Sequence, residues 1–354
     1  MTPEIKGLIR ADLLPVLDLD PASAEPEQAD GISLHLNENA LGSPLKKWYN
    51  RYPDPHQIQL KQAVSKIKGV QAANIFLGSG TDECVDVLLK TFCEPEKDNI
   101  LICNPGLERV QFVAALLKVE VRIAVLQDDF QPDLITLENL VDEHTKMIFL
   151  SSPNKISGVS IDKDALELIL NNFHGLLVVD EAYVNFSKKP SLIKELPDYD
   201  RLVVLQTFSK AWGMAALRIA IAIGSPDVIA CMKQIKGSFN ISQCSADLFI
   251  EASSNIASVN TMIREIVLMR NALQDIFRQL PAEVKVYPSE ANFILIRLNE
   301  ARKLYEHLLN AGIRVFYAGD LPLCENGLRI SVGNEFENTR LIDSIFDFFM
   351  QTTK

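Results

Sequence analysis

The stretch Leu202-Val203-Val204-Leu205-Gln206-Thr207-Phe208-Ser209-Lys210 is an apolar, β-branched run that ends in polar residues and a lysine. Similar apolar runs occur at residues 100–103, 121–125, 147–150 and 176–179, and apolar residues at helical spacing fill the segments between them. This alternation is typical of a largely parallel sheet with helices on both faces. The predicted fold class is therefore α/β.

The chain of 354 residues is long for one hydrophobic core, which favours two domains. Helices are expected at residues 55–68, 81–92, 107–118 and 163–171, and Gly69 lies where the first of them should end. A long helical pattern at residues 255–279 precedes short strands and another helix, which predicts a smaller α+β unit. We predict an N-terminal arm at residues 1–45 that joins the small domain, a large cofactor-binding domain at 46–255 and a small domain at 256–354.

Composition excludes several classes of function. The net charge is −11 and no stretch combines Lys and Arg with aromatic residues, so nucleic acid is not an expected partner. No window approaches eighteen uninterrupted apolar residues, which argues against a membrane span. The six cysteines and five histidines lack metal-ligand spacing, so no metal site is expected. The N-terminus has no signal-peptide pattern, and we expect a cytoplasmic protein that acts on small molecules.

Two polar positions after apolar runs are candidates for a site, because ligands of doubly wound sheets bind beyond the carboxyl ends of the strands. Asp180 follows the run at 176–179, and its carboxylate can hold a protonated pyridine nitrogen or simply cap a loop. Lys210 can form an imine with an aldehyde, and Arg218 can clamp a phosphate. Taken alone, Lys210 fits a surface lysine better than a catalytic one.

A third position supports the first two. The turn Gly78-Ser79-Gly80-Thr81 leads from a short predicted strand into a helix, where free N–H groups attract phosphate. Ser79 or Thr81 would also serve as the N-cap of an ordinary helix. A phosphate cradle, an acid at a strand end, and a lysine and an arginine after a later strand occur in that order. Together they predict one site for pyridoxal 5′-phosphate (PLP).

With these motifs the sequence resembles the aspartate-aminotransferase-like (fold type I) family, and most closely its histidinol-phosphate aminotransferase branch. The resemblance extends along nearly the whole chain. It implies a large domain with a mostly parallel, seven-stranded sheet between helices, plus the smaller α+β domain. It also implies transfer of an amino group between an amino acid or histidinol phosphate and a 2-oxo acid such as 2-oxoglutarate. The stretches that carry it are Asn37-Glu38-Asn39, Arg51-Tyr52-Pro53-Asp54-Pro55, Asp180-Glu181-Ala182-Tyr183, Thr207 through Arg218, and Leu328-Arg329-Ile330-Ser331-Val332-Gly333.

The resemblance assigns roles to individual residues. Lys210 is the Schiff-base lysine and proton shuttle, Asp180 pairs with the ring nitrogen N1, and Tyr183 hydrogen-bonds the ring oxygen O3′. Asn37 lies near the substrate, and Arg329 either meets an anionic end of the substrate or forms a surface ion pair. The resemblance implies a homodimer with shared active sites. The residues assigned to the cofactor phosphate are Gly80, Thr81, Asp82, Thr207, Ser209 and Arg218, with Tyr52 from the neighbouring subunit.

Four positions depart from the family pattern. Leu107 stands where an aromatic ring should stack on the cofactor, and Lys155 stands where an asparagine should bond O3′. Val16 replaces a tyrosine of the arm, and Phe316 replaces a second arginine, although Arg314 is two residues away. They spare most of the cofactor-anchoring residues and remove several substrate-side ones. They leave open another amino-acid substrate, decarboxylation of a phosphorylated amino acid, or a weakly catalytic PLP-binding protein.

Overall fold

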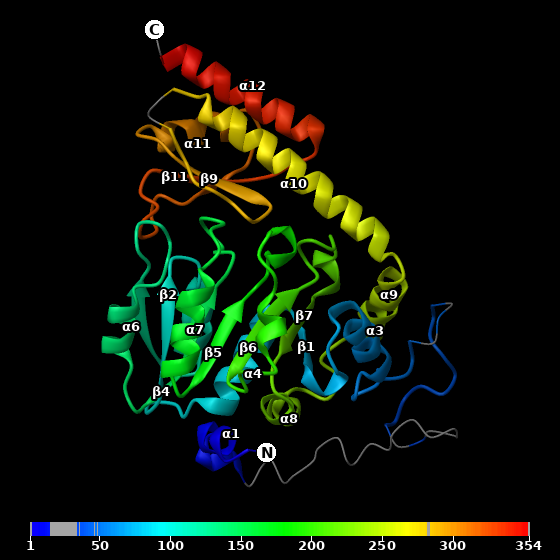
Figure 1. Ribbon diagram of the computed structural model, residues 1–354. Coiled ribbons are helices and arrows are strands. Elements are labelled where there is room, and N and C mark those ends of the chain that lie inside the picture. The colour runs from blue at the N-terminus through cyan, green and yellow to red at the C-terminus, as the bar shows by residue number, and fades with distance from the viewer. Residues whose placement is uncertain are drawn as a thin grey trace.

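A seven-stranded sheet forms the centre of the larger domain in the computed structural model, which describes residues 2–14, 34, 36–45, 47, 49–281 and 284–352. β7 runs antiparallel to both of its neighbours, and the other adjacent strands are parallel (Figure 1). The predicted α/β class with a mostly parallel sheet is confirmed. In spatial order the strands are β1 (Ile75–Ser79), β7 (Ile219–Ile223), β6 (Leu202–Thr207), β5 (Leu176–Asp180), β4 (Thr145–Ser151), β2 (Asn99–Asn104) and β3 (Glu120–Val125).

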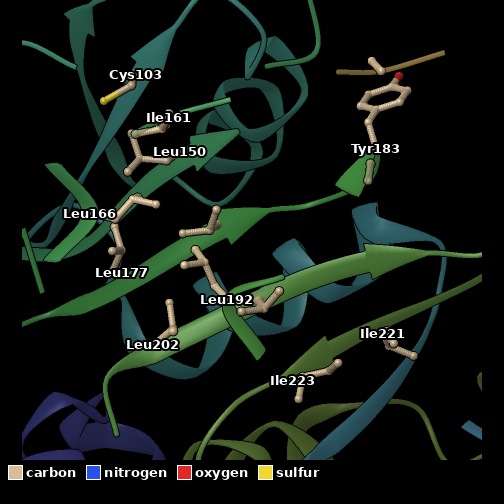
Figure 2. Packing of buried hydrophobic residues seen from close by; sticks show 14 of the residues in the cluster. Cys103, Leu150, Ile161, Leu166, Leu177, Tyr183, Leu192, Leu202, Ile221 and Ile223 are labelled. Atoms are coloured by element: carbon tan, nitrogen blue, oxygen red, sulfur yellow. The ribbon is translucent and has the colours of Figure 1, made fainter. Parts of the chain in front are cut away.

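The sheet is buried on both faces because its strands are apolar at successive positions. Leu177 and Val179 of β5 belong to one core cluster, whereas Val178 belongs to another on the opposite face. Figure 2 shows side chains of the first cluster, including Leu177 and Ile221. β7 was not predicted, although its alternation of isoleucine with alanine is a strand pattern.

Helices cover the two faces and protect the backbone of the central strands. One cluster includes side chains from α1 (Pro3–Leu8), α4 (Thr81–Phe92), α5 (Glu108–Leu116) and α8 (Pro226–Ile235). The other includes side chains from α3 (Ile58–Lys68), α6 (Leu134–Leu140), α7 (Lys163–Asn172) and α9 (Gln243–Ser253). Among the described residues, no helix has the length and apolar character that crossing a bilayer requires.

The start of the N-terminal arm packs on the large domain, not on the small domain as predicted. Ile5 in α1 is fully buried in the cluster beneath α4 and α8. The backbone N–H of Arg10 donates to the carbonyl of Thr91 at the end of α4 (3.2 Å). These contacts were missed because six helical residues give too short a pattern to show which face is buried.

The C-terminal part forms a second α+β layer that lies beyond the carboxyl ends of the parallel strands. Its antiparallel sheet contains, in order, β10 (Phe316–Tyr317), β11 (Gly327–Ser331), β9 (Phe293–Arg297) and β8 (Lys285–Val286). The helices are α10 (Ile256–Arg278), α11 (Ala301–Asn310) and α12 (Glu335–Thr352), and α10 runs from the large domain to the small one (Figure 1). Arg270 of α10 is buried and donates to the carbonyls of Phe186 and Ala291 (3.2 and 3.0 Å). The exact domain boundary stays a prediction, because α10 contacts both parts.

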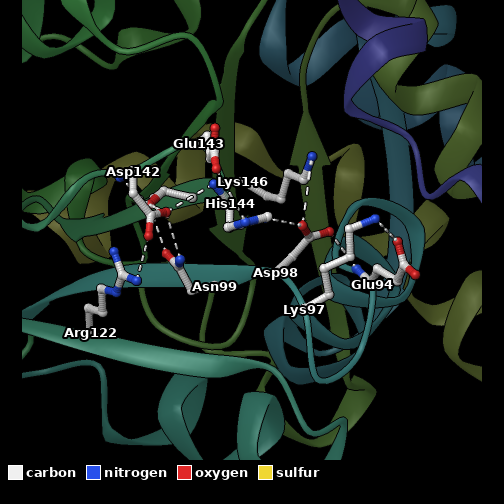
Figure 3. A network of polar contacts seen from close by, with 10 residues as sticks. Glu94, Lys97, Asp98, Asn99, Arg122, Asp142, Glu143, His144 and Lys146 are labelled. Carbon is white, nitrogen blue, oxygen red and sulfur yellow. Dashed lines mark hydrogen bonds and ion pairs between the residues drawn. The ribbon is translucent and has the colours of Figure 1, made fainter.

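A polar network holds the amino ends of the strands (Figure 3). The Asp142 carboxylate accepts hydrogen bonds from Asn99 at the start of β2 (2.9 Å) and from Arg122 in β3 (2.6 Å). The Asn99 and Arg122 hydrogen bonds hold the pKa of Asp142 well below its usual range. The network therefore fixes the register of the sheet at the end opposite to the polar residues predicted to form a site.

We predict that Gly158→Ala destabilises the contact between the two domains. Gly158 has φ +78°, and its carbonyl accepts the N–H of Glu290 (2.8 Å). An added Cβ would overlap the Ser289 hydroxyl oxygen and lie 2.9 Å from Ser289 Cβ. A left-handed backbone costs about 1 to 2 kcal/mol and overpacking adds about 1 to 3 kcal/mol, so the denaturant midpoint should fall clearly.

Gly69→Ala is the matched control, because Gly69 has φ +68° but no atom lies within 4 Å of the position that its added methyl group would take. This variant should lose only the stability that the left-handed backbone costs, without the added cost of overpacking. Equal losses of stability in the two variants would contradict the predicted clash with Ser289.

Candidate active site

The polar residues singled out in the sequence meet at the carboxyl edge of the large sheet, beneath β9 and β11 of the small domain. Asp180 is the last residue of β5 and is 4% exposed. One carboxylate oxygen accepts the N–H of Ala182 (3.0 Å), and the other lies 2.5 Å from the Nζ of Lys155. Asp180 is therefore a buried carboxylate whose partner comes from the loop after β4.

Lys155 remains protonated in this environment. Burial lowers the pKa of its amine, but the charge of Asp180 and the hydrogen bond to it raise the pKa, and the net direction is upward. The Lys155–Asp180 pair is thus an ion pair at neutral pH. The predicted contact of Lys155 with the cofactor stays a prediction.

Lys210 and Tyr183 lie beside each other at the same edge. The Nζ of Lys210 is 5.7 Å from the centroid of the Tyr183 ring, and the lysine side chain is exposed. Tyr183 is 8% exposed and packs edge-on against Phe293 of β9, with ring centroids 5.1 Å apart. An accessible primary amine thus stands beside a ring that the small domain holds in place.

The turn before α4 forms a small cationic cradle. Gly80 has φ +86°, and a Cβ there would overlap Nη2 of Arg218 and lie 3.3 Å from its Cζ. Only glycine lets the guanidinium approach the backbone so closely. The first N–H groups of α4 have no side-chain cap at Gly80, so they are available to an anion.

Two hydroxyls, one at the end of β6 and one just after it, lie near this cradle. The Thr207 hydroxyl donates to the Ser209 hydroxyl oxygen (3.0 Å) and accepts the backbone N–H of Ser209 (3.1 Å). Thr207 is paired with Ala220 of β7, and Ser79 of β1 is paired with Ile219 of the same strand. A guanidinium, helix N–H groups and hydroxyls on adjacent segments suit a phosphate group.

Arg329 lies at the cofactor side of the small domain. Its guanidinium is 4.3 Å from the ring centroid of Phe316 and 5.3 Å from that of Phe293. Nη1 donates to the carbonyl oxygen of Lys155 (2.7 Å), and burial lowers the pKa of the guanidinium. Arg329 is therefore a half-buried cation between two aromatic rings, and not half of a surface ion pair.

Three other predicted site residues, Leu107, Tyr52 and Asn37, are not brought into this group within the single chain. Leu107 is 1% exposed and packs in the core, so a contact with the cofactor ring stays a prediction that requires the side chain to turn out of the core. Tyr52 is 56% exposed and stacks on Phe239 (4.7 Å), and Asn37 is exposed. Their roles stay predictions, and Val16 lies outside the described residues. Thr81 and Asp82 begin α4, where Asp82 pairs with Arg109 (2.7 Å).

The sequence did not reveal the aromatic contacts of the small domain or the role of Glu181. Phe293 touches both Tyr183 and Arg329, but no spacing in the sequence connects β9 with β5. Glu181 is 3% exposed and accepts hydrogen bonds from Gln206 (2.8 Å) and the Leu192 N–H (2.7 Å). Burial raises the pKa of Glu181. Its position directly after Asp180 was the only signal for this second buried acid.

Comparison with known proteins places this site in a family. The family model for class I and II aminotransferases matches residues 38–345. Histidinol-phosphate aminotransferases from Parabacteroides distasonis and Cytophaga hutchinsonii are 37% and 38% identical, over 97% and 96% of this chain and 98% and 97% of theirs. The crystal structure of histidinol-phosphate aminotransferase from Sinorhizobium meliloti with pyridoxal-5′-phosphate has a TM-score of 0.76 at 22% identity, covering 97% of this chain and 95% of that one.

The chain belongs to the class I and II aminotransferase family of PLP-dependent enzymes. PLP is therefore its cofactor. The residues fit this group, since the Gly80 and Arg218 cradle suits its phosphate, Asp180 suits a protonated ring nitrogen and Lys210 offers the amine. The particular relatives that match over nearly the full length are histidinol-phosphate aminotransferases.

We predict that Gly80→Ala weakens PLP binding at least tenfold, which corresponds to about 1.4 kcal/mol. The new methyl group should displace the Arg218 guanidinium and strain the left-handed backbone. Absorbance titration of the PLP-depleted protein measures the affinity. Introducing Gly80→Ala into an Arg218→Ala background should have a much smaller effect, because the displaced group is gone. Equal effects in both backgrounds would show that Gly80 does not act through Arg218.

We also predict that Lys210→Ala removes the covalent attachment of PLP without unfolding the protein, because the lysine is exposed and fills no core space. After borohydride reduction, mass spectrometry should find the added cofactor mass in the parent chain and not in the variant. Lys188→Ala, which removes another exposed lysine, should retain it. A cofactor adduct of normal yield in Lys210→Ala would refute the assignment.

Proposed function

We propose that this aminotransferase takes histidinol phosphate as amino donor and a 2-oxo acid such as 2-oxoglutarate as acceptor. The observation that carries the proposal is the convergence of Lys210, Asp180 and Arg329 on one edge of the sheet. The names of full-length relatives at 37% and 38% identity support the choice of donor. The amine and the acid serve the cofactor, whereas Arg329 faces the substrate side.

Each side chain of the site has a separate part in the proposed transfer of the amino group. PLP supplies the electron sink that makes a proton on the substrate carbon acidic. Lys210, whose exposed amine lies beside the Tyr183 ring, would take that proton from the substrate carbon and hold it for its return. Asp180 would hold a proton on the ring nitrogen, and Arg218 with the Gly80 turn would bind the phosphate. The small domain shields this edge through Phe293 and Arg329.

One well-oriented cation, Arg329, supports the binding of an anionic group of the substrate. Arg329 is oriented by Phe316, Phe293 and the Lys155 carbonyl, which leaves its guanidinium preorganised. Phe316 occupies the position of the second arginine expected from the resemblance. Arg314 is exposed and lines a different hollow beside Phe336 and Arg340. This arrangement also favours a donor with one carboxylate in place of a phosphate, which is the second candidate class.

We further propose a homodimer in the cytoplasm. Tyr52 is exposed in the single chain although the family resemblance directs it to a neighbouring cofactor, and Leu41 and Leu248 are apolar side chains that are also exposed. A second copy of the chain would cover such residues and complete the site. All six cysteines are free thiols, and five are buried, which suits a reducing compartment.

The donor proposal predicts that the PLP-loaded protein converts histidinol phosphate in a single turnover much faster than unphosphorylated histidinol or common amino acids. Stopped-flow absorbance of the bound cofactor reports the rate, and mass spectrometry identifies the carbonyl product. Faster reaction with another amino acid would replace the proposed donor. Release of carbon dioxide from a phosphorylated amino acid would identify a decarboxylase, and no reaction with any donor would identify a protein that only binds PLP.

Arg329→Met tests how the donor is recognised. The concentration of histidinol phosphate at half-maximal rate should rise at least tenfold, or about 1.4 kcal/mol, because a charge-assisted contact is lost. The value for unphosphorylated histidinol should change far less. Arg314→Met is the matched control, since this arginine is exposed and lies elsewhere. Equal losses for both donors in Arg329→Met would show that Arg329 does not bind the phosphate.

A further inference from the structure

The residue that partners Asp180 is a cation supplied by the protein itself. The Nζ of Lys155 lies 2.5 Å from Oδ2 of Asp180, and Oδ1 accepts the N–H of Ala182 (3.0 Å). The Asp180 side chain is only 5% exposed. The carboxylate that serves the ring nitrogen of the cofactor is therefore already engaged at both oxygens by protein groups.

The position of Lys155 is determined by the loop that carries it, which four hydrogen bonds hold. The side-chain oxygen of Asn154 accepts the N–H groups of the two residues after Lys155 (2.9 Å each) and closes the turn. Arg329 donates to the Lys155 carbonyl (2.7 Å), and the N–H of Ser152 donates to the backbone carbonyl of Asp180 (3.0 Å). The loop after β4 and the end of β5 are thus joined, and the amine is directed to the carboxylate.

The charged and titratable groups around Lys155 come from three parts of the fold. Asp180 ends β5 and Tyr183 follows it, Asp82 lies in α4, and the Arg329 guanidinium approaches from β11. Asp180 is the strongest of the attractive partners, and the net effect keeps Lys155 protonated at neutral pH. An ammonium at 2.5 Å offsets much of the negative potential that Asp180 offers to any second cation.

We propose that Lys155 competes with the pyridine nitrogen of PLP for Asp180 and thereby sets both the affinity for PLP and the protonation of that nitrogen. A protonated pyridine is a cation, and two cations that share one carboxylate repel each other. The family resemblance expects an uncharged asparagine at this position, so the competition is a property of this chain. Lys155 is a positioning residue in this role. The inference depends on the PLP site but not on the identity of the amino donor.

The first test compares the PLP dissociation constants of full-length, PLP-depleted variants. Lys155→Met removes the charge and keeps most of the length, Lys155→Asn installs the expected family residue, and Lys155→Arg keeps the charge. We expect PLP to bind at least tenfold more tightly to the Met and Asn variants, and within about threefold of the parent for Arg. Retained melting transitions would verify that the variants fold.

Lys68→Met is the matched control for loss of a buried lysine. Lys68 lies over the Phe208 ring at 5.2 Å, and burial lowers its pKa to about 8, with Glu181 as the opposing charge. It is near the acid that follows Asp180, but it does not pair with Asp180. This variant should bind PLP with unchanged affinity.

The second test measures the ring nitrogen directly, with PLP labelled with ¹⁵N at N1 and bound to the protein. The pH at which the nitrogen signal titrates should rise by about one unit or more in Lys155→Met, because Asp180 then serves one cation only. The signal reports protonation and does not depend on turnover.

The results distinguish failure of the Lys155 proposal from failure of the cofactor site and of the proposed function. Unchanged PLP affinity and unchanged nitrogen titration in Lys155→Met would overturn the proposal, and so would weaker binding, which would show that the ammonium binds the cofactor instead of competing with it. Failure of the parent and all variants to bind PLP would overturn the cofactor site as well. Both tests use no donor, so failure of histidinol phosphate to react would count only against the proposed function.

Discussion

The structure depends on placing one carboxylate, that of Asp180, in a nearly water-free position at the end of a central strand. β5 pairs with β4 on one side and β6 on the other, and Asp180 is paired with Ser151 and Leu205 in these ladders. A buried carboxylate is costly without a partner. The parallel sheet brings a partner to this carboxylate, because the segments that leave β4, β5 and β6 all emerge at the same edge. Lys155, Tyr183 and Lys210 arrive beside Asp180 for this reason.

The two domains share this site through a few direct contacts. Phe293 packs against Tyr183, and Arg329 donates to the carbonyl of Lys155, so side chains of the small domain touch residues of the candidate site. A substrate anion bound by Arg329 would therefore act on a residue already linked to the Lys155 loop. Substrate recognition and cofactor electrostatics are connected by one short chain of contacts, from Arg329 through Lys155 to Asp180.

The departures from the family pattern lie on the proposed substrate side and beside the Asp180 carboxylate. The residues expected to anchor the cofactor match the family pattern. Gly80 and Arg218 preserve a phosphate cradle, and Lys210 retains an accessible amine. Phe316 and Lys155, in contrast, alter the charge on the substrate side and beside the carboxylate. The first group fits the family to which the chain belongs, whereas the proposals on the donor and on the electron sink rest on the second. These are separate questions because they involve different side chains.

The sequence by itself determined the α/β class, most strands and helices of the large domain, and the candidate residues Lys210, Asp180 and Arg218, because these follow from local periodicity and from polar residues after apolar runs. It also identified Lys155 as unusual. Only the tertiary structure decided that Lys155 pairs with Asp180, that Leu107 is buried in the core, and that the first residues pack on the large domain. Such contacts join segments far apart in the chain, and their geometry depends on how helices and sheet pack, which no local pattern encodes.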